Sequence, residues 1–328
     1  MRPKLRLAHL PTPLWHSTAL DSALGTTVWV KRDDMTAGAE AGNKIRKLEY
    51  LLAEALERGA TWVITCGAVQ SNHARATALL AARLGLRSLL FLRTVAPGVA
   101  HAATGNLLLD RLAGAEIRLI TPEQYRRRAE LMEEAAAELA QRDEVAYVIP
   151  EGGSNGLGAL GYVDAMREVR EQLELGLGGG PEPFDAVVHA CGSGGTAAGV
   201  ALGARRFEVA HTVHAVAVCD DRDYFAQVIA RIVGEAVGLE PRLGQRADLI
   251  IHDAWKGPGY GMVSPEQRDF LVDIARGTGL VLDPVYSAKA LFALSQMDPK
   301  PRRVLFLHTG GLPGLLAQAD LFGEVWSA

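Results

Sequence analysis

The chain has 328 residues, a formal net charge of −4 and 48% hydrophobic residues, so it lacks the basic surface of a nucleic-acid-binding protein. We find neither an apolar run of the roughly 18–20 residues that a membrane span needs nor the apolar core of a signal peptide after the basic first residues. The three cysteines (Cys66, Cys191 and Cys219) have no metal-site spacing and do not form an even disulfide set, so we expect a cytoplasmic protein that binds no metal. From the charge and the lack of a long apolar run, we expect neither a nucleic-acid partner nor association with a membrane.

Short β-branched and apolar segments recur along the chain, and several of them are apolar at every position. Strands covered on both faces have this pattern. Longer helical patterns separate the segments, which favours an α/β fold with open, mostly parallel twisted sheets and helices on both faces. The predicted strands are 28–31, 62–65, 88–92, 117–120, 146–149, 186–189, 213–218 and 304–307.

Two helices are predicted early in the chain. From residue 43, apolar side chains recur at spacings of three and four, and Gly59 ends the pattern. Asn72 is a candidate N-cap for the next helix, which we expect to run to Leu84.

Later segments are more polar. Pro122 begins a long charged helix that we expect to continue to about Arg142. The glycine- and proline-rich stretch 176–183 has the composition of a flexible connection, and it is either a domain boundary or a surface loop.

A lysine stands in the first turn of the helix that begins near residue 43, directly after Gly42 and Asn43. The positive potential of a helix N-terminus disfavours an ammonium ion and favours the neutral amine that attacks a carbonyl. Lys44 is therefore a candidate Schiff-base lysine. Its charged neighbours leave open that it is a solvated lysine on a charged helix.

A glycine-rich segment follows the predicted strand 186–189 and opens a helix of small residues. Backbone N–H groups in such a turn can bind a phosphate, and hydroxyls can add donors. The segment lacks the lysine of a P-loop, and it is not a dinucleotide-binding GxGxxG sequence. The alternative that this segment is a tight strand–helix turn that binds no ligand is left open. The predicted phosphate-binding residues are Gly192, Ser193, Gly194, Gly195 and Thr196.

Three further motifs place polar side chains at turns. Ser71 and Asn72 lie in QSNH, where free N–H groups suit a carboxylate or an aromatic oxygen, although a simple N-cap is equally compatible. Tyr260 and Tyr286 follow proline-containing turns that can hold a phenol toward a cleft, although packing is the commoner role. Thr309 follows the last predicted strand, where a hydroxyl can face the ligand crevice of an open sheet or cap a turn.

In this order and spacing the motifs resemble one family. The chain resembles the D-cysteine desulfhydrase and 1-aminocyclopropane-1-carboxylate (ACC) deaminase family of pyridoxal-5′-phosphate (PLP) enzymes, which have the tryptophan synthase β-like fold, PLP fold type II. The resemblance extends from residue 10 to residue 311. Its motifs are KRDD (31–34), GNKIRKLE (42–49), QSNH (70–73), EGGSNGLGALGY (151–162), GSGGT (192–196) and LDPVY (282–286).

The resemblance implies a PLP cofactor and a role for each candidate residue. Lys44 would bind PLP covalently and later transfer protons, and residues 192–196 would hold the phosphate. A hydroxyl at the pyridine nitrogen would not keep the ring protonated, which weakens its electron withdrawal. The other implied roles are Asn72 at the phenolic oxygen, Ser71 beside the substrate carboxylate, Tyr260 and Tyr286 on the substrate side, and Thr309 at the pyridine nitrogen.

The residue after the second tyrosine favours one branch of the family. ACC deaminases typically carry glutamate there, whereas this chain has Ser287. We therefore expect β-elimination from a small amino acid, D-cysteine, with pyruvate, ammonia and sulfide as products. The alternatives are ACC deaminase, L-cysteate sulfo-lyase and, in a different class, a non-catalytic PLP- or nucleotide-binding protein. Ala41, Trp255 and Lys256 depart from the family pattern and could change the pocket.

The resemblance also implies the domain organisation. A small α/β domain, residues 47–155, would be inserted into a large PLP-binding domain formed by residues 1–46 and 156–328. The stretch 176–183 would then be a loop inside the large domain. Such enzymes are usually homodimers.

Overall fold

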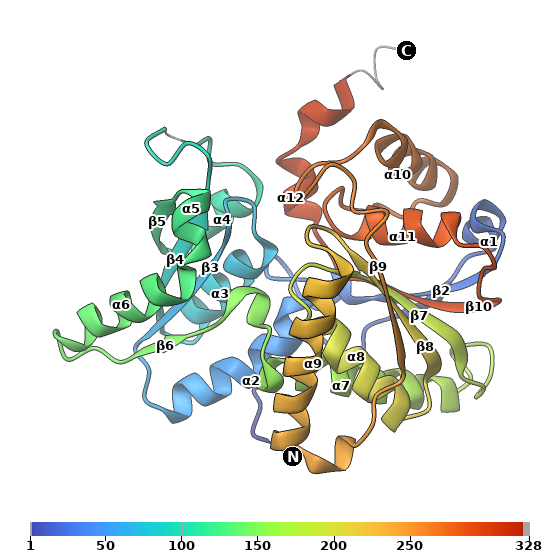
Figure 1. Ribbon diagram of the computed structural model, residues 1–328, viewed down its shortest axis with the longest axis horizontal. Helices are drawn as coiled ribbons and strands as arrows, with labels where there is room; N and C mark the ends of the chain where they lie inside the picture. Colours follow the sequence, from blue (N-terminus) through green and yellow to red (C-terminus); the bar gives the residue numbers. More distant parts are fainter. Residues whose placement is uncertain (1, 100, 324–328) are drawn as a thin grey trace.

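The computed structural model describes residues 2–99 and 101–323, which form two open sheets flanked by helices (Figure 1). The six-stranded sheet has the order β1-β2-β10-β7-β8-β9, and the four-stranded sheet has the order β5-β4-β3-β6. Of the strand pairs in the described ranges, only β1–β2 is antiparallel. The predicted fold class is confirmed.

All eight predicted strands are present. Two more strands, β1 and β9, were not predicted, because both lie at sheet edges and are short and incompletely buried. The strands are β1 (Leu14–His16), β2 (Thr27–Arg32), β3 (Trp62–Ala68), β4 (Arg87–Arg93), β5 (Glu116–Ile120), β6 (Ala146–Val148), β7 (Phe184–Cys191), β8 (Ala210–Ala217), β9 (Asp248–His252) and β10 (Arg303–His308).

The helices cover the faces of both sheets, and Figure 1 shows α3–α6 around the four-stranded sheet at the left. None of the described helices is long and apolar enough to cross a membrane. They are α1 (Thr18–Leu24), α2 (Lys44–Glu57), α3 (Asn72–Arg83), α4 (Gly105–Leu112), α5 (Pro122–Arg126), α6 (Arg128–Ala140), α7 (Gly156–Glu174), α8 (Gly195–Arg206), α9 (Arg222–Leu239), α10 (Pro265–Thr278), α11 (Ser287–Gln296) and α12 (Leu312–Leu316).

Two predicted helix boundaries were wrong. Helix α3 is capped by Ser71 and not by Asn72, because Ser71 has the extended backbone of an N-cap and its Oγ accepts the N–H of Ala74 at 3.2 Å. The helix predicted from Pro122 to Arg142 is two helices. At Arg127 the backbone leaves helical geometry (φ −100°, ψ 21°), and its N–H donates to a carbonyl only three residues back.

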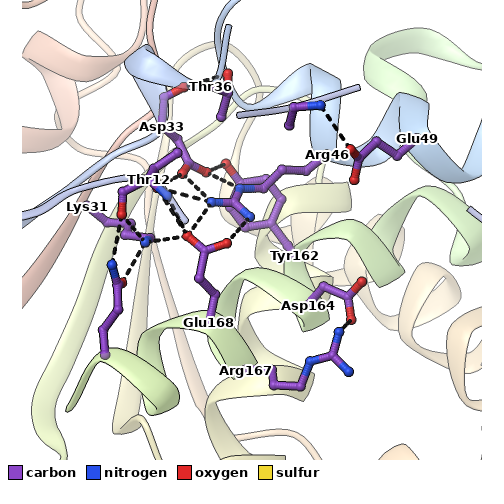
Figure 2. Close-up of polar contacts among 12 residues, drawn as sticks. Thr12, Lys31, Asp33, Thr36, Arg46, Glu49, Tyr162, Asp164, Arg167 and Glu168 are labelled. Atoms are coloured by element: carbon purple, nitrogen blue, oxygen red, sulfur yellow. Dashed lines mark hydrogen bonds and ion pairs between the residues drawn. The ribbon is translucent and has the colours of Figure 1, made fainter. Parts of the chain in front are cut away.

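A buried polar network fixes helix α2 against helix α7 (Figure 2). The guanidinium of Arg46 donates to both oxygens of Asp33 at 2.8 Å and to Glu168 at 2.9 and 3.1 Å. Lys31 donates to Glu168, and the Tyr162 hydroxyl donates to Asp33 at 2.6 Å. Although burial acts to raise the pKa of Asp33, the charge of Arg46 holds it below its usual value. When every polar group of a buried network is hydrogen-bonded, the network favours a single arrangement of its side chains. This network therefore fixes the position of α2, which begins at Lys44, relative to α7.

Candidate active site

A cavity of 820 Å³ collects almost all of the predicted site residues. The carboxyl ends of parallel strands meet at one edge of a sheet, and segments that follow β3, β7 and β10 contribute to the cavity wall. Gly195 is the one predicted site residue that does not line the cavity. Those that do are Lys44, Ser71, Asn72, Gly192, Ser193, Gly194, Thr196, Tyr260, Tyr286 and Thr309.

Lys44 is the first residue of α2, and its side chain lines the cavity. Asn43 links it to the glycine-rich segment, because Oδ1 of Asn43 accepts from Lys44 Nζ at 3.1 Å and Nδ2 donates to Thr196 Oγ1 at 3.2 Å. Burial lowers the pKa of Lys44 to about 8. A large fraction of the amine is therefore neutral near pH 8, which favours a nucleophilic lysine over a solvated one.

The glycine-rich segment joins the end of β7 to the start of α8. Gly194 has φ +82°, which favours glycine, and a Cβ on Gly192 would lie only 3.2 Å from the ring of Tyr286. Both glycines line the cavity, so the segment forms a concavity in its wall. It precedes a 12-residue helix whose N-terminus favours an anion. Gly195 itself donates its N–H to Ser154 Oγ at 3.2 Å.

A second lysine lies behind this concavity, and the sequence analysis missed it. Lys47 is buried, and its Nζ donates to the carbonyl of Gly152 at 3.1 Å and to Ser154 Oγ at 3.2 Å. Burial and then the charge of Lys44 hold the pKa of Lys47 well below its usual value. A phosphate in the concavity would supply the missing negative charge, so these residues fit a phosphate-bearing cofactor. The spacing of three from Lys44 could have revealed Lys47, because it places both side chains on one helix face.

The two predicted tyrosines form a pair. The hydroxyls of Tyr260 and Tyr286 lie 2.6 Å apart, and the rings pack edge to face. Burial raises the pKa of Tyr260 to about 12 and raises the pKa of Tyr286 well above its usual value. Both phenols are therefore protonated at neutral pH, and the pair can hold and donate a proton inside the cavity.

Lys289 positions both tyrosine segments, and this residue was also missed. It lies on α11 three residues after Tyr286, is fully buried, and donates to the carbonyls of Lys256 at 2.6 Å and Gly259 at 2.8 Å. Gly259 directly precedes Tyr260. Burial lowers the pKa of Lys289 to about 8. One ammonium group thus ties the loop of Tyr260 to the helix that follows Tyr286.

We expect Lys289→Met to lower kcat about tenfold with a smaller change in KM, because the Tyr260 loop loses two buried charge-assisted hydrogen bonds. Steady-state kinetics with the cofactor absorbance as a check on folding would measure this. Lys256→Met is the matched control, because Lys256 contributes only its backbone carbonyl to the contact. Equal kcat in both variants would contradict a positioning role for Lys289.

The residues that depart from the family pattern lie outside the cavity wall. Ala41, Trp255 and Lys256 do not line the cavity, and neither does Ser287. The Ser287 hydroxyl donates to Asp283 Oδ1 at 2.6 Å at the start of α11. Any effect of these residues on the pocket is therefore indirect.

An amine in a cavity wall, a concavity for an anion and a pair of proton-holding phenols define a class: an α/β enzyme that works with a phosphate-bearing aldehyde cofactor. The chain belongs to the family described as pyridoxal-phosphate dependent enzymes, whose family model matches residues 5–310. The predicted cofactor and the prediction of an enzyme are thus confirmed, and the alternative of a non-catalytic binding protein is set aside.

Relatives whose names state an activity are similar to almost the whole of this chain. The chain is 44% identical to a bifunctional D-cysteine desulfhydrase/1-aminocyclopropane-1-carboxylate deaminase, mitochondrial, of Arabidopsis thaliana, over 98% of this chain and 82% of the relative. It is 44% identical to a putative 1-aminocyclopropane-1-carboxylate deaminase of Thermotoga maritima, over 96% of this chain and 98% of the relative. It is 38% identical to a D-cysteine desulfhydrase of Klebsiella pneumoniae, over 96% of each chain.

Solved structures agree with the fold. A crystal structure described as an ACC deaminase homologue superposes with a TM-score of 0.88 and 34% identity, over 99% of this chain and 96% of the other. A threonine deaminase superposes with a TM-score of 0.64 at 21% identity, over 92% of each chain, which shows the shared fold alone. The predicted resemblance is confirmed.

Proposed function

We propose that this enzyme catalyses β-elimination from D-cysteine, which with water gives pyruvate, ammonia and sulfide. The observation that carries the proposal is that the hydroxyl-bearing Thr309 lines the cavity. The residue after Tyr286 is Ser287, which does not line it, so that position supplies no carboxylate to the cavity. A hydroxyl at the pyridine nitrogen would not keep the ring protonated, so the ring withdraws fewer electrons. Weak electron withdrawal suits a substrate with a good leaving group on Cβ better than the opening of a carbon ring.

The bound cofactor would supply a conjugated ring that stabilises negative charge at Cα. The start of α3 and the Ser71 hydroxyl bind the substrate carboxylate. The Lys44 amine takes the Cα proton, and the Cβ–S bond then breaks with its electron pair leaving on sulfur. The Tyr260–Tyr286 pair can donate a proton to the departing sulfide. Water hydrolyses the released aminoacrylate to pyruvate and ammonia.

A substrate panel tests the proposal. The purified enzyme is incubated with both enantiomers of cysteine, with ACC and with L-cysteate, and ketoacid, sulfide and sulfite are measured. We expect the highest kcat/KM for D-cysteine, with pyruvate and sulfide formed in equal amounts. A higher kcat/KM for ACC, with a four-carbon ketoacid as the product, would overturn the proposal.

ACC deaminase is the second candidate, because the relatives from Arabidopsis thaliana and Thermotoga maritima carry that activity in their names. L-Cysteate is a third substrate that fits the same elimination, with sulfite in place of sulfide. The panel separates all three.

We expect Tyr286→Phe to lower kcat about 10- to 100-fold, because the variant removes one of the two bonded hydroxyls that hold the proton. The cofactor absorbance band should persist, since the aromatic ring at position 286, which leaves no room for a Cβ on Gly192, remains. Kinetics and an absorbance spectrum of the same sample measure both effects. Loss of the cofactor from this variant would contradict our assignment of Tyr286 to the substrate side.

We also propose the predicted assembly: a small domain of residues 47–155 inserted into a large domain of residues 1–46 and 156–328, a homodimer, and a cytoplasmic location. All strands of the four-stranded sheet fall between residues 62 and 148, which supports the insertion, although the first boundary falls within α2. The three cysteines are free thiols, which suits a reducing compartment. Light scattering should give the mass of two 35.1 kDa chains.

A further inference from the structure

Among the described residues, Arg93 is a partly buried cation of the cavity wall that has no anionic partner. Arg93 is the last residue of β4, is half-buried and lines the cavity. Its guanidinium carbon lies 4.8 Å from the ring centre of Tyr125 and 5.4 Å from that of Tyr260. Within the described ranges, its guanidinium makes no hydrogen bond or ion pair. A partly buried charge without a partner is costly, so an unpaired one in a cavity wall indicates a ligand.

The acidic side chains of the cavity do not neutralise Arg93. Of the described residues that line the cavity, Glu151 and Asp220 are the acidic ones, and neither forms an ion pair with it. Glu151 instead accepts from the Tyr125 hydroxyl at 2.6 Å and pairs with Arg128 at 3.0 Å. The donors of the Arg93 guanidinium therefore remain available.

The ring contacts prepare Arg93 for an anion. Two aromatic rings from different segments hold the planar group, which reduces the freedom it would lose on binding. A guanidinium so held can donate two parallel hydrogen bonds to a carboxylate or sulfonate. Arg93 contacts Tyr260, whose hydroxyl is bonded to that of Tyr286, so the free donors lie on the proposed substrate side of the cavity.

We propose that Arg93 binds the negative charge of the substituent on substrate Cβ and so selects amino acids whose Cβ group already carries a negative charge in the bound substrate. This inference rests on the proposed β-elimination. The thiolate of cysteine and the sulfonate of cysteate belong to this class, whereas the ring carbon of ACC does not. When the Cβ–S bond breaks, its electron pair goes to sulfur, and Arg93 offsets the charge of the departing sulfide or sulfite. Arg93 transfers no proton, because a guanidinium stays protonated.

A binding experiment measures the contribution of the negative charge on substrate Cβ apart from that of the α-carboxylate. The cofactor-loaded enzyme is titrated with D-aspartate and D-alanine, which differ by one carboxylate on Cβ, and absorbance gives Kd. We expect wild type to bind D-aspartate about tenfold more tightly than D-alanine, and Arg93→Met to remove this difference while leaving the Kd of D-alanine unchanged. Equal weakening of both ligands would assign Arg93 to the α-carboxylate and overturn the inference, and so would a preserved difference.

Kinetics give the second test. Arg93→Met should lower kcat/KM for D-cysteine and cysteate about 10- to 100-fold, but by no more than about threefold for β-chloro-D-alanine, whose substituent is uncharged and leaves readily. Arg118→Met is the matched control, because Arg118 on β5 contacts the ring of Phe91 and does not line the cavity. Equal losses on all three substrates would overturn the inference. Absence of pyruvate from every substrate with wild type would instead refute the proposed function.

Discussion

Lys44→Ala should lower kcat by at least about 10³-fold, because the variant removes the amine that we propose both bonds the cofactor and takes the Cα proton. The lysine lines the cavity beside the concavity at 192–196, and burial lowers its pKa to about 8, which favours the neutral amine. The visible absorbance band of the covalently bound cofactor should disappear as well. Single-turnover kinetics and an absorbance spectrum of the purified variant measure both results.

Lys4→Ala is the control for this prediction. Lys4 is exposed near the N-terminus and pairs with Asp164 at 2.6 Å, away from the cavity wall. It should retain full turnover and the cofactor band. Appreciable turnover in Lys44→Ala would mean that another lysine, such as Lys47, carries the chemistry.

Arg46→Met should lower the free energy of unfolding by about 3–5 kcal/mol, the usual result of removing one partner from a buried ion pair. The substitution keeps an unbranched apolar stem but removes the guanidinium, and so leaves Asp33 and Glu168 without their cationic partner. Urea denaturation followed by circular dichroism measures the change, provided the m-value is unchanged.

Arg58→Met at the C-cap of the same helix provides the comparison. Arg58 is 62% exposed and pairs with Glu54 four residues earlier, so its loss should cost no more than about 1 kcal/mol. Equal changes in the two variants would contradict the view that the buried network in Figure 2 fixes α2.

The central strands could be predicted from the sequence, because strands covered on both faces are apolar at successive positions, as in β3 and β7. The edge strands β1 and β9 lack that pattern. The break at Arg127 was not predictable either, because Tyr125, Met132, Ala135 and Leu139 keep one helical spacing across it and no proline or glycine marks it. Ser71 and Asn72 are both good N-caps, and only the backbone conformation separates them.

The motifs with distinctive local chemistry, Lys44 and the glycine-rich segment, were predictable, because their residue types suggest the chemistry without a partner. Lys47, Lys289 and Arg93 were not predicted. Their roles depend on what lies across space: a carbonyl of Gly152 for Lys47, the Tyr260 loop for Lys289, and two tyrosine rings with no acid for Arg93. The segments around Lys289 and Arg93 do not record those neighbours, whereas the spacing of three from Lys44 could have pointed to Lys47.

The central claim is that the amine of Lys44 bonds the cofactor. Borohydride reduction of the loaded enzyme, followed by proteolysis and peptide mass spectrometry, locates that bond directly. We expect the cofactor-derived mass on Lys44 alone. The same mass on one of the buried lysines, Lys31, Lys47 or Lys289, or on no lysine at all, would contradict the claim.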